Sequence, residues 1–131
     1  MPLLTLTGQS LSLADVVSVA RDPAAILRLD PAALGRLGES RRLVEQAMAR
    51  GGAIYGINTG FGAFANKVIP ADKTRRLQLN LIRSHACGTG APLPPQIVRR
   101  MLLLKANNLA GGFSGARPEI VDRLLALLNA D

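Results

Sequence analysis

The chain has 131 residues and a mass of 13.8 kDa, which suffices for one modest domain. Apolar residues make up 48% of it, and this fraction excludes disordered and collagen-like proteins. A single cysteine excludes an internal disulfide framework, and a single histidine excludes a multi-histidine metal site. The aliphatic composition, with 13 Gly, 8 Pro and no Trp, favours helices joined by loops over a β-sandwich.

The net charge of +7 comes from 16 Lys and Arg against 9 Asp and Glu. Arginine pairs lie in three separate predicted helices, with almost no aromatic side chains for stacking on bases. We therefore expect no nucleic-acid partner. The competing hypothesis about the function is that the chain is a small basic helical module that binds nucleic acid or a partner helix. No apolar run reaches the roughly 18 residues of a membrane span, and the start has no basic leader, so we expect a cytoplasmic protein without a membrane partner.

The first fifty residues contain signals for one extended segment followed by helices. Residues 3–7 alternate weakly in hydrophobicity and predict a short strand or an extended arm. Helix starts are expected where a capping side chain stands before an apolar run or before a proline. These starts are Ser12-x-x-Asp15, Asp22-Pro23 and Asp30-Pro31, and a longer helix is expected over about 39–50, ended by Gly51-Gly52.

Residues 53–64 interrupt the helical pattern. Apolar and aromatic side chains alternate irregularly with glycines there, and no helix or strand period fits them. This pattern predicts an ordered loop with an extended segment near 53–57, since it is too apolar for a solvated linker. Functional residues concentrate on structured loops, so this Tyr/Gly loop is the first candidate site.

The remaining residues predict three helices separated by glycine turns. Leu77, Leu81 and His85 fall on one line of the first helix, which leads into a His/Gly loop over 84–93. The expected helix starts are Pro70-Ala71-Asp72, Pro94-Pro95 and Pro118. The last helix is apolar around much of its girth, so we expect it to need several packing partners and the isolated chain to self-associate.

Tyr55 and His85 are the only tyrosine and histidine, and each has a structural and a functional interpretation. A lone tyrosine is more often a core or edge residue, and a histidine on an apolar line is more often a core histidine. Tyr55, however, stands at the head of a glycine loop, where a phenol can act as acid or base if its pKa is lowered. His85 stands where a helix opens onto a second glycine loop.

The other reactive side chains have structural explanations. Cys87 and Ser84 are poor partners for His85, because residues one or two apart on a helix point in different directions. Most of the aspartates have helix-capping positions, and no pair of carboxylates is spaced for a metal or for glycoside hydrolysis. We therefore expect no metal site.

Three ordered motifs resemble a known family. Residues 55–62 (YGINTGFG), 84–93 (SHACGTGAPL) and 107–117 (NNLAGGFSGAR) are similar to consecutive motifs of the ammonia-lyases that use a methylidene-imidazolone (MIO) group, and most of all to the histidine ammonia-lyases among them. The resemblance covers residues 53–131, whereas the first fifty residues fit in general character only. It implies a mainly α chain, the N-terminal helical part of the ammonia-lyase (aspartase/fumarase-like) fold.

The resemblance also implies roles for individual residues. These enzymes remove the α-amino group and a β-hydrogen from an L-amino acid, giving trans-urocanate and ammonia when the substrate is L-histidine. Tyr55 would be the catalytic base at the β-proton, and His85 would bind the substrate. The backbone at Gly62 would approach the substrate without a Cβ in the way, and Asn58 would hold the loop. The family resemblance further implies a homotetramer.

One departure from the family pattern affects the cofactor. The family forms MIO from an internal Ala-Ser-Gly, and this sequence has none; Phe113-Ser114-Gly115 is the nearest match and belongs to another motif. We therefore expect residues 1–131 to be a single N-terminal domain or fragment that is inactive alone, with MIO and the carboxylate-binding arginine lying beyond Asp131. A tyrosine ammonia-lyase or an MIO-dependent aminomutase is the alternative within the same superfamily.

Overall fold

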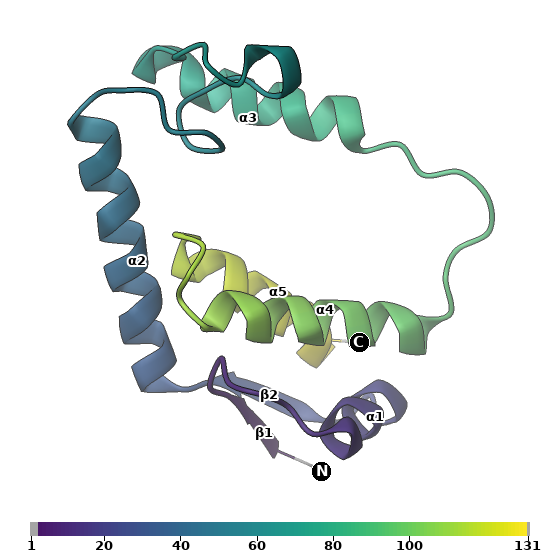
Figure 1. The fold of residues 1–131 in the computed structure, drawn as a ribbon. Helices are drawn as coiled ribbons and strands as arrows, with labels where there is room; N and C mark the ends of the chain where they lie inside the picture. The colour runs from purple at the N-terminus through teal and green to yellow at the C-terminus, as the bar shows by residue number, and fades with distance from the viewer. Residues whose placement is uncertain (1–2, 131) are drawn as a thin grey trace. The chain divides into compact units, whose positions relative to one another are not determined.

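The structure, a computed structural model, describes residues 3–130 and is mainly helical (Figure 1). Its elements are β1 (Leu3–Leu6), α1 (Leu13–Arg21), β2 (Ile26–Leu29), α2 (Pro31–Ala49), the 3-10 turn η1 (Gly62–Phe64), α3 (Ala71–His85), α4 (Pro95–Ala110) and α5 (Pro118–Ala130). The chain divides into two compact units: unit 1 is Met1–Leu43 with Pro92–Asp131, and unit 2 is Val44–Ala91.

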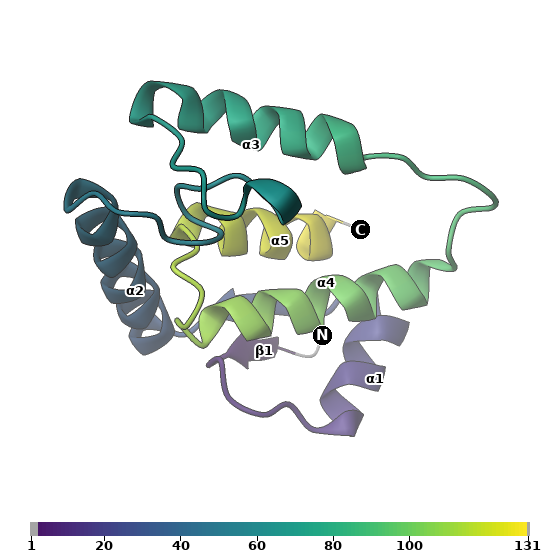
Figure 2. The same ribbon diagram turned by 45° about the horizontal axis from the view of Figure 1, so that its top comes forward.

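Unit 1 is built around a parallel strand pair covered by helices. β1 and β2 pair from Leu3 opposite Ile26 to Leu6 opposite Leu29. Helix α4 packs against both α1 and α5, as the two ribbon views show (Figures 1 and 2). The buried aliphatic core comes from all these elements: Leu6, Val19, Ala25, Leu27, Leu37, Leu103, Ala106, Leu109, Val121, Leu125 and Leu128.

The free edge of β2 is completed by a side chain from α5. The backbone N–H of Leu27 donates to Asn129 Oδ1 at 2.9 Å, and Asn129 Nδ2 donates to the Leu27 carbonyl at 3.0 Å. The amide thus takes the place of a third strand at one residue. This satisfies backbone groups that would otherwise be unpaired near the core.

The prediction of a helix after Asp22-Pro23 is wrong. The Asp22 carboxylate accepts from the backbone N–H of Ala24 at 2.9 Å, and the resulting turn leads into strand β2 instead. Pairing with β1 is a long-range interaction, and it outweighs the local helix-start signal. The strand expected over 3–7 is confirmed at Leu3–Leu6.

Helix α2 is one continuous helix over Pro31–Ala49. The prediction of two separate helices, one after Asp30 and one over 39–50, is therefore wrong, although both regions are helical. Asp30 Oδ1 caps the helix by accepting from the N–H groups of Ala32 and Ala33, as predicted. Gly35 and Gly38 lie inside the helix without breaking it. Its end at the glycine pair is confirmed, because Gly51 has a φ of 72°, a conformation that favours glycine.

The extended segment expected near 53–57 is also wrong. The N–H groups of Ile57 and Asn58 both donate to the Ile54 carbonyl, at 3.1 and 3.2 Å, so the chain turns there. Gly56 has a φ of 79°, which a strand does not use and which glycine adopts without strain.

Arg99 is the buried charge that holds three helices of unit 1 together. It lies on α4 and is 7% exposed. Its Nε donates to the Val19 carbonyl at 3.1 Å, one terminal nitrogen donates to Asp22 O at 3.4 Å and the other donates to Leu128 O at 3.1 Å. These carbonyls belong to the last turns of α1 and α5, where the helix dipole is negative and carbonyls lack helical partners.

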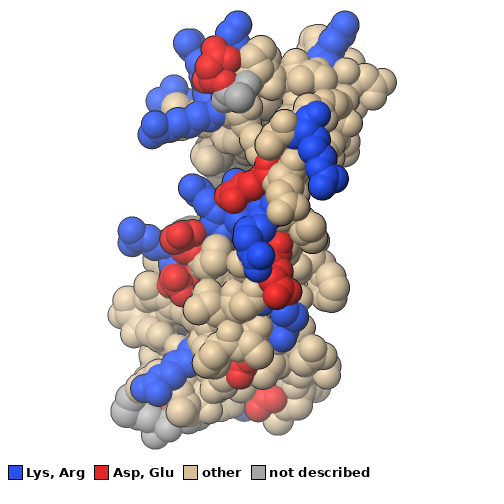
Figure 3. Space-filling view, turned by 90° about the vertical axis from the view of Figure 1, so that its left-hand side faces the viewer, with Lys and Arg blue, Asp and Glu red and all other residues tan. Residues whose placement is uncertain are grey.

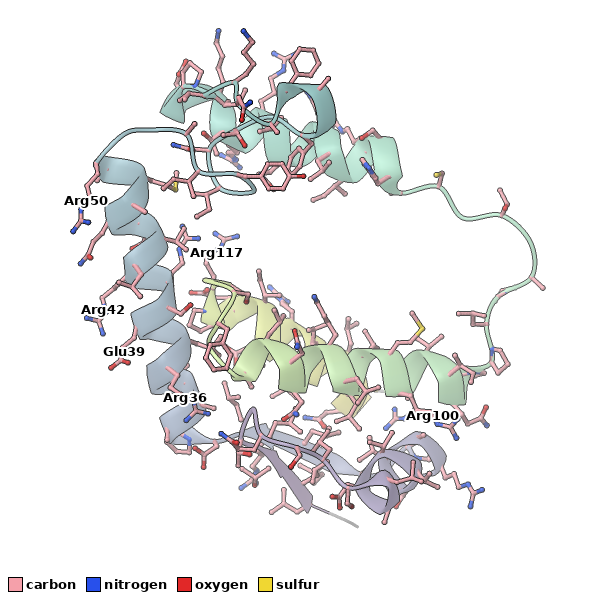
Figure 4. All side chains as sticks on the ribbon, viewed as in Figure 1. Arg36, Glu39, Arg42, Arg50, Arg100 and Arg117 are labelled. Atoms are coloured by element: carbon pink, nitrogen blue, oxygen red, sulfur yellow. The ribbon has the colours of Figure 1, made fainter. Side chains whose placement is uncertain are left out.

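The charged side chains elsewhere are dispersed. Acidic side chains lie among the basic ones on the face drawn in Figure 3. Glu39 and Arg42 project from the same side of α2 (Figure 4), so an acidic and a basic side chain are neighbours there, whereas Arg36 donates to the Thr7 carbonyl. None of the described helices has the combination of length and apolar character that a bilayer crossing requires.

We predict that Arg99→Met lowers the free energy of unfolding of the chain by about 2–3 kcal/mol, because it leaves helix-end carbonyls buried without a donor. Urea denaturation followed by circular dichroism measures this. The control is Arg123→Met on the exposed side of α5, which should change stability by less than about 0.5 kcal/mol. Equal effects of the two substitutions would contradict the role assigned to Arg99.

Candidate active-site loops

Tyr55 sits in a tight turn between α2 and α3. The turn is closed by the two hydrogen bonds to the Ile54 carbonyl described above. The Tyr55 side chain is 66% exposed, and its ring meets that of Phe61 edge-to-face with centroids 6.2 Å apart. The phenol is therefore presented to the outside of unit 2 by a structured turn, so of the two structural interpretations of Tyr55, a core or an edge residue, the core position is wrong.

Asn58 holds this turn with both its side chain and its backbone. Its Oδ1 accepts from the N–H of Ile54 at 2.8 Å, and its Nδ2 donates to the Gly52 carbonyl at 2.7 Å. Its own carbonyl accepts from the N–H of Ile69 at 2.8 Å. The residue is 6% exposed, so these bonds are largely shielded from water. Asn58 ties both sides of the Tyr55 turn to the segment that precedes α3.

The glycine part of the loop closes on itself. Thr59 and Val68 form an antiparallel bridge, and the N–H of Gly60 donates to the Lys67 carbonyl at 3.1 Å. A Cβ at Gly60 would lie 2.6 Å from the Cβ of Phe64, so this position requires glycine. The backbone at Gly60 and the residue Phe64 therefore lie in close contact across the turn between them.

Gly62 requires glycine on other grounds. Its φ is 56°, in the left-handed region, while a Cβ there would meet nothing within 4 Å in this chain. The backbone at Gly62 is therefore open on the side where a side chain would stand.

His85 is the last residue of α3 and is exposed, so the interpretation of His85 as a core histidine is wrong. Leu77 and Leu81, on the same helical line, are only partly buried. The His85 Nδ1 lies 2.9 Å from the Leu81 carbonyl and 3.0 Å from Ser84 Oγ. The Cys87 thiol lies against the backbone carbonyl of His85 and not against its ring.

The structure places Tyr55, Asn58 and Gly62 in one loop and His85 at the end of a helix in the same unit. No hydrogen bond or ring contact joins Tyr55 to His85 among the residues that the structure describes. What was missed from the sequence is the connection of Ser84 to the His85 ring. The signal was available, because a serine or histidine near a helix end bonds back to the carbonyl three or four residues earlier.

The third motif has a structural role in unit 1. Asn107 Oδ1 accepts from the N–H of Gly8 at 3.1 Å, and its Nδ2 donates to the Gln9 carbonyl at 2.6 Å. Ser40 Oγ accepts from the N–H of Gly115 at 2.8 Å. The motif thus ties the end of α4 to the loop after β1 and to α2.

A cavity of about 370 Å³ lies in unit 2, at the end of α2 and the start of α3. Its lining is mostly apolar and consists of Met48, Ala49, Gly51, Asn58, Val68, Ile69, Pro70 and Thr74. Neither Tyr55 nor His85 lines it. Within residues 3–130, no group of three or more His, Cys, Asp or Glu side chains is placed to hold a metal ion.

The chain belongs to the aromatic amino acid lyase family. The family profile described as "Aromatic amino acid lyase" matches residues 11–131.

Among the members of this family, curated histidine ammonia-lyases are close relatives. The chain is 46% identical to that of Geobacillus thermodenitrificans over 98% of its own length, and 46% identical to that of Bacillus subtilis over 97%. It is 47% identical to that of Gloeobacter violaceus over 96%. The chain spans only about a quarter of the length of these relatives: 25%, 25% and 24%.

Solved structures of related enzymes have the same fold. Histidine ammonia-lyase from Trypanosoma cruzi matches with a TM-score of 0.86 at 35% identity, over 99% of this chain and 24% of that one. Ergothionase from Treponema denticola matches with 0.92 at 32%, over 97% and 25%. Tyrosine aminomutase from Streptomyces globisporus matches with 0.88 at 30%, over 98% and 24%. The prediction of the ammonia-lyase fold is confirmed.

We predict that Asn58→Ala loosens the Tyr55 turn, because it removes the partners of the Ile54 N–H and the Gly52 carbonyl. Trypsin should then cleave after Lys67, inside the loop, at least about ten-fold faster, since unpaired buried groups cost about 1–3 kcal/mol each. The matched control is Asn80→Ala on the exposed side of α3. Unchanged cleavage in Asn58→Ala would show that another interaction holds the turn.

Proposed function

We propose that this chain contributes the tyrosine loop and the histidine-bearing helix end to the active site of a histidine ammonia-lyase. The reaction is the non-oxidative deamination of L-histidine to trans-urocanate and ammonia. The observation that carries the proposal is the turn held by Asn58, which presents an exposed phenol beside a glycine backbone that no side chain covers. The identity of 46–47% with three histidine ammonia-lyases supports the choice of substrate.

Each candidate residue has a role in this proposal. Tyr55 is the base that takes the β-proton, and its exposed position leaves the phenol oxygen accessible to a substrate. His85 binds the substrate side chain from the end of α3. Gly62 allows the substrate to approach the backbone, and Asn58 keeps the loop in shape.

The family's cofactor does not come from this chain. MIO forms from an Ala-Ser-Gly tripeptide, and none occurs among the 131 residues. When present, the group supplies the strong electrophile that elimination of ammonia needs. The residues of this chain do not fit its formation, so we assign them substrate binding and proton transfer only, and expect the tripeptide in the remaining length that the relatives have.

A tyrosine-specific lyase or aminomutase is the second candidate. The observation in its favour is the match to the tyrosine aminomutase structure with a TM-score of 0.88, although at 30% identity. A phenol, like an imidazole, can form a hydrogen bond with His85. Product analysis with L-histidine and L-tyrosine separates the two candidates.

The proposal extends to assembly and location. A homotetramer and a cytoplasmic location accompany the proposed histidine degradation. In unit 2 the apolar side chains are largely exposed, among them Tyr55 (66%), Phe64 (64%) and Ile82 (64%). Such exposure is typical of surfaces that are covered in an assembly.

The activity test compares the 131-residue chain with the complete reading frame that contains it. The chain alone should form no urocanate from L-histidine, followed by its ultraviolet absorbance, because it lacks the cofactor tripeptide. In the complete protein, Tyr55→Phe should lower kcat by about 10²–10⁴, the contribution of a general base. Thr5→Val, on an exposed position of β1, is the control that removes a hydroxyl elsewhere. Turnover by the chain alone, or a fully active Tyr55→Phe protein, would overturn the proposal.

We also predict that the isolated chain self-associates through its exposed leucines. Light scattering should give a mass above the 13.8 kDa of one chain. Replacing Leu104 and Leu127, which are 51% and 61% exposed on α4 and α5, with glutamine should lower that mass. The control is Leu13→Gln at an isolated exposed position (79%). A wild-type chain that is monomeric at all concentrations tested would contradict the prediction.

A further inference from the structure

The ring of His85 is held on one side only. Its Nδ1 lies 2.9 Å from the Leu81 carbonyl oxygen and 3.0 Å from Ser84 Oγ. Ser84 Oγ in turn donates to the same Leu81 carbonyl at 3.0 Å. The Leu81 oxygen, Ser84 Oγ and His85 Nδ1 thus all lie within hydrogen-bond distance of one another. They meet because Ser84 and His85 follow Leu81 by three and four residues, which is about one helical turn.

This set of three atoms has one consistent arrangement of protons. A carbonyl oxygen can only accept hydrogen bonds, and a neutral imidazole has one N–H and one bare nitrogen. If Nδ1 were the bare nitrogen, its lone pair would face the carbonyl lone pairs at 2.9 Å. With the proton on Nδ1, the ring donates to the carbonyl and Ser84 Oγ can accept from the same N–H while donating its own hydrogen to Leu81.

We infer that the Leu81 carbonyl and the Ser84 hydroxyl hold His85 as the Nδ1–H tautomer, so that the bare Nε2 serves as a hydrogen-bond acceptor at the end of α3. The inference rests on the proposed function for its biological use. An acceptor at this position selects substrates whose side-chain ring carries a donor, such as an imidazole N–H or a phenol O–H. A plain phenyl ring offers no such group.

Ser84 is a positioning residue in this scheme. The Ser84 hydroxyl donates its hydrogen to the Leu81 carbonyl, so it has no hydrogen left to donate to a substrate. Its effect passes through the ring of His85. The interaction of one histidine nitrogen with a fixed partner commonly sets what the other nitrogen can do.

The direct test is a long-range ¹H–¹⁵N NMR spectrum of the ¹⁵N-labelled chain, in which two- and three-bond couplings distinguish the tautomers. The chain has one histidine, so the ring signals need no assignment by mutation. The spectrum is recorded in mildly alkaline buffer, in which imidazole side chains are neutral. We expect the Nδ1–H pattern in the wild type, and an Nε2–H pattern there would overturn the inference.

Two variants test whether the Ser84 hydroxyl contributes to the tautomer of His85. Ser84→Ala leaves the Leu81 carbonyl in place and should raise the Nε2–H share measurably, whereas an unchanged share would remove Ser84 from the inference. Cys87→Ala is the matched control, because this thiol contacts only the backbone carbonyl of His85, and it should leave the pattern unchanged. A shift in Cys87→Ala as large as in Ser84→Ala would contradict the specific role of Ser84.

A kinetic measurement on the complete protein connects the tautomer to substrate selection. Ser84→Ala should raise KM for the donor-bearing substrate about five-fold with little change in kcat, the effect of weakening one hydrogen bond. An unchanged KM alongside a shifted tautomer would overturn the link to substrate selection. Activity with L-tyrosine and none with L-histidine would instead refute the proposed function and leave the tautomer assignment intact.

Discussion

The buried guanidinium of Arg99 is the interaction on which the order of unit 1 depends. A leucine-rich core is non-directional and can pack in several ways, whereas hydrogen bonds to the last turns of α1 and α5 have one geometry. The charge is acceptable in the interior because carbonyl oxygens and two negative helix ends surround it. The β1–β2 pair and the Asn129 amide at its edge then have a defined place on these helices.

Unit 2 is held together by a different kind of interaction. The buried hydrophobic side chains that the structure describes all belong to unit 1, and the buried polar side chains of unit 2 are Asn58 and Thr59. The shape of the Tyr55 loop therefore depends on hydrogen bonds and on glycine conformations. This leaves Tyr55 and Phe64 exposed, as expected if the proposed active site is completed by substrate and by further protein. Hydrogen bonds also orient the exposed ring of His85, which lies against the Leu81 carbonyl oxygen and Ser84 Oγ and is not buried.

Local signals in the sequence predicted much of this fold. The capping box of Ser12 and Asp15, the cap at Asp30 and the glycine stop at Gly51 were all readable, since they depend on neighbouring residues. Strand β2 was not readable, because its pairing partner lies more than twenty residues away. For the site, composition and spacing pointed to Tyr55 and His85 but favoured structural roles for them, a core or edge position for Tyr55 and a core position for His85. The roles assigned to them came from the family resemblance, and the exposure of both side chains came from the structure.

The central claim is that the Tyr55 loop is already shaped by Asn58 within this chain, before any substrate is bound. Native-state amide hydrogen exchange of the wild-type chain tests it directly at Ile54 and Ile69, whose N–H groups donate to Asn58. We expect both amides to exchange at least about a hundred-fold more slowly than in an unstructured peptide. Exchange of both at the unstructured rate would show that the loop has no stable shape in this chain and would contradict the account.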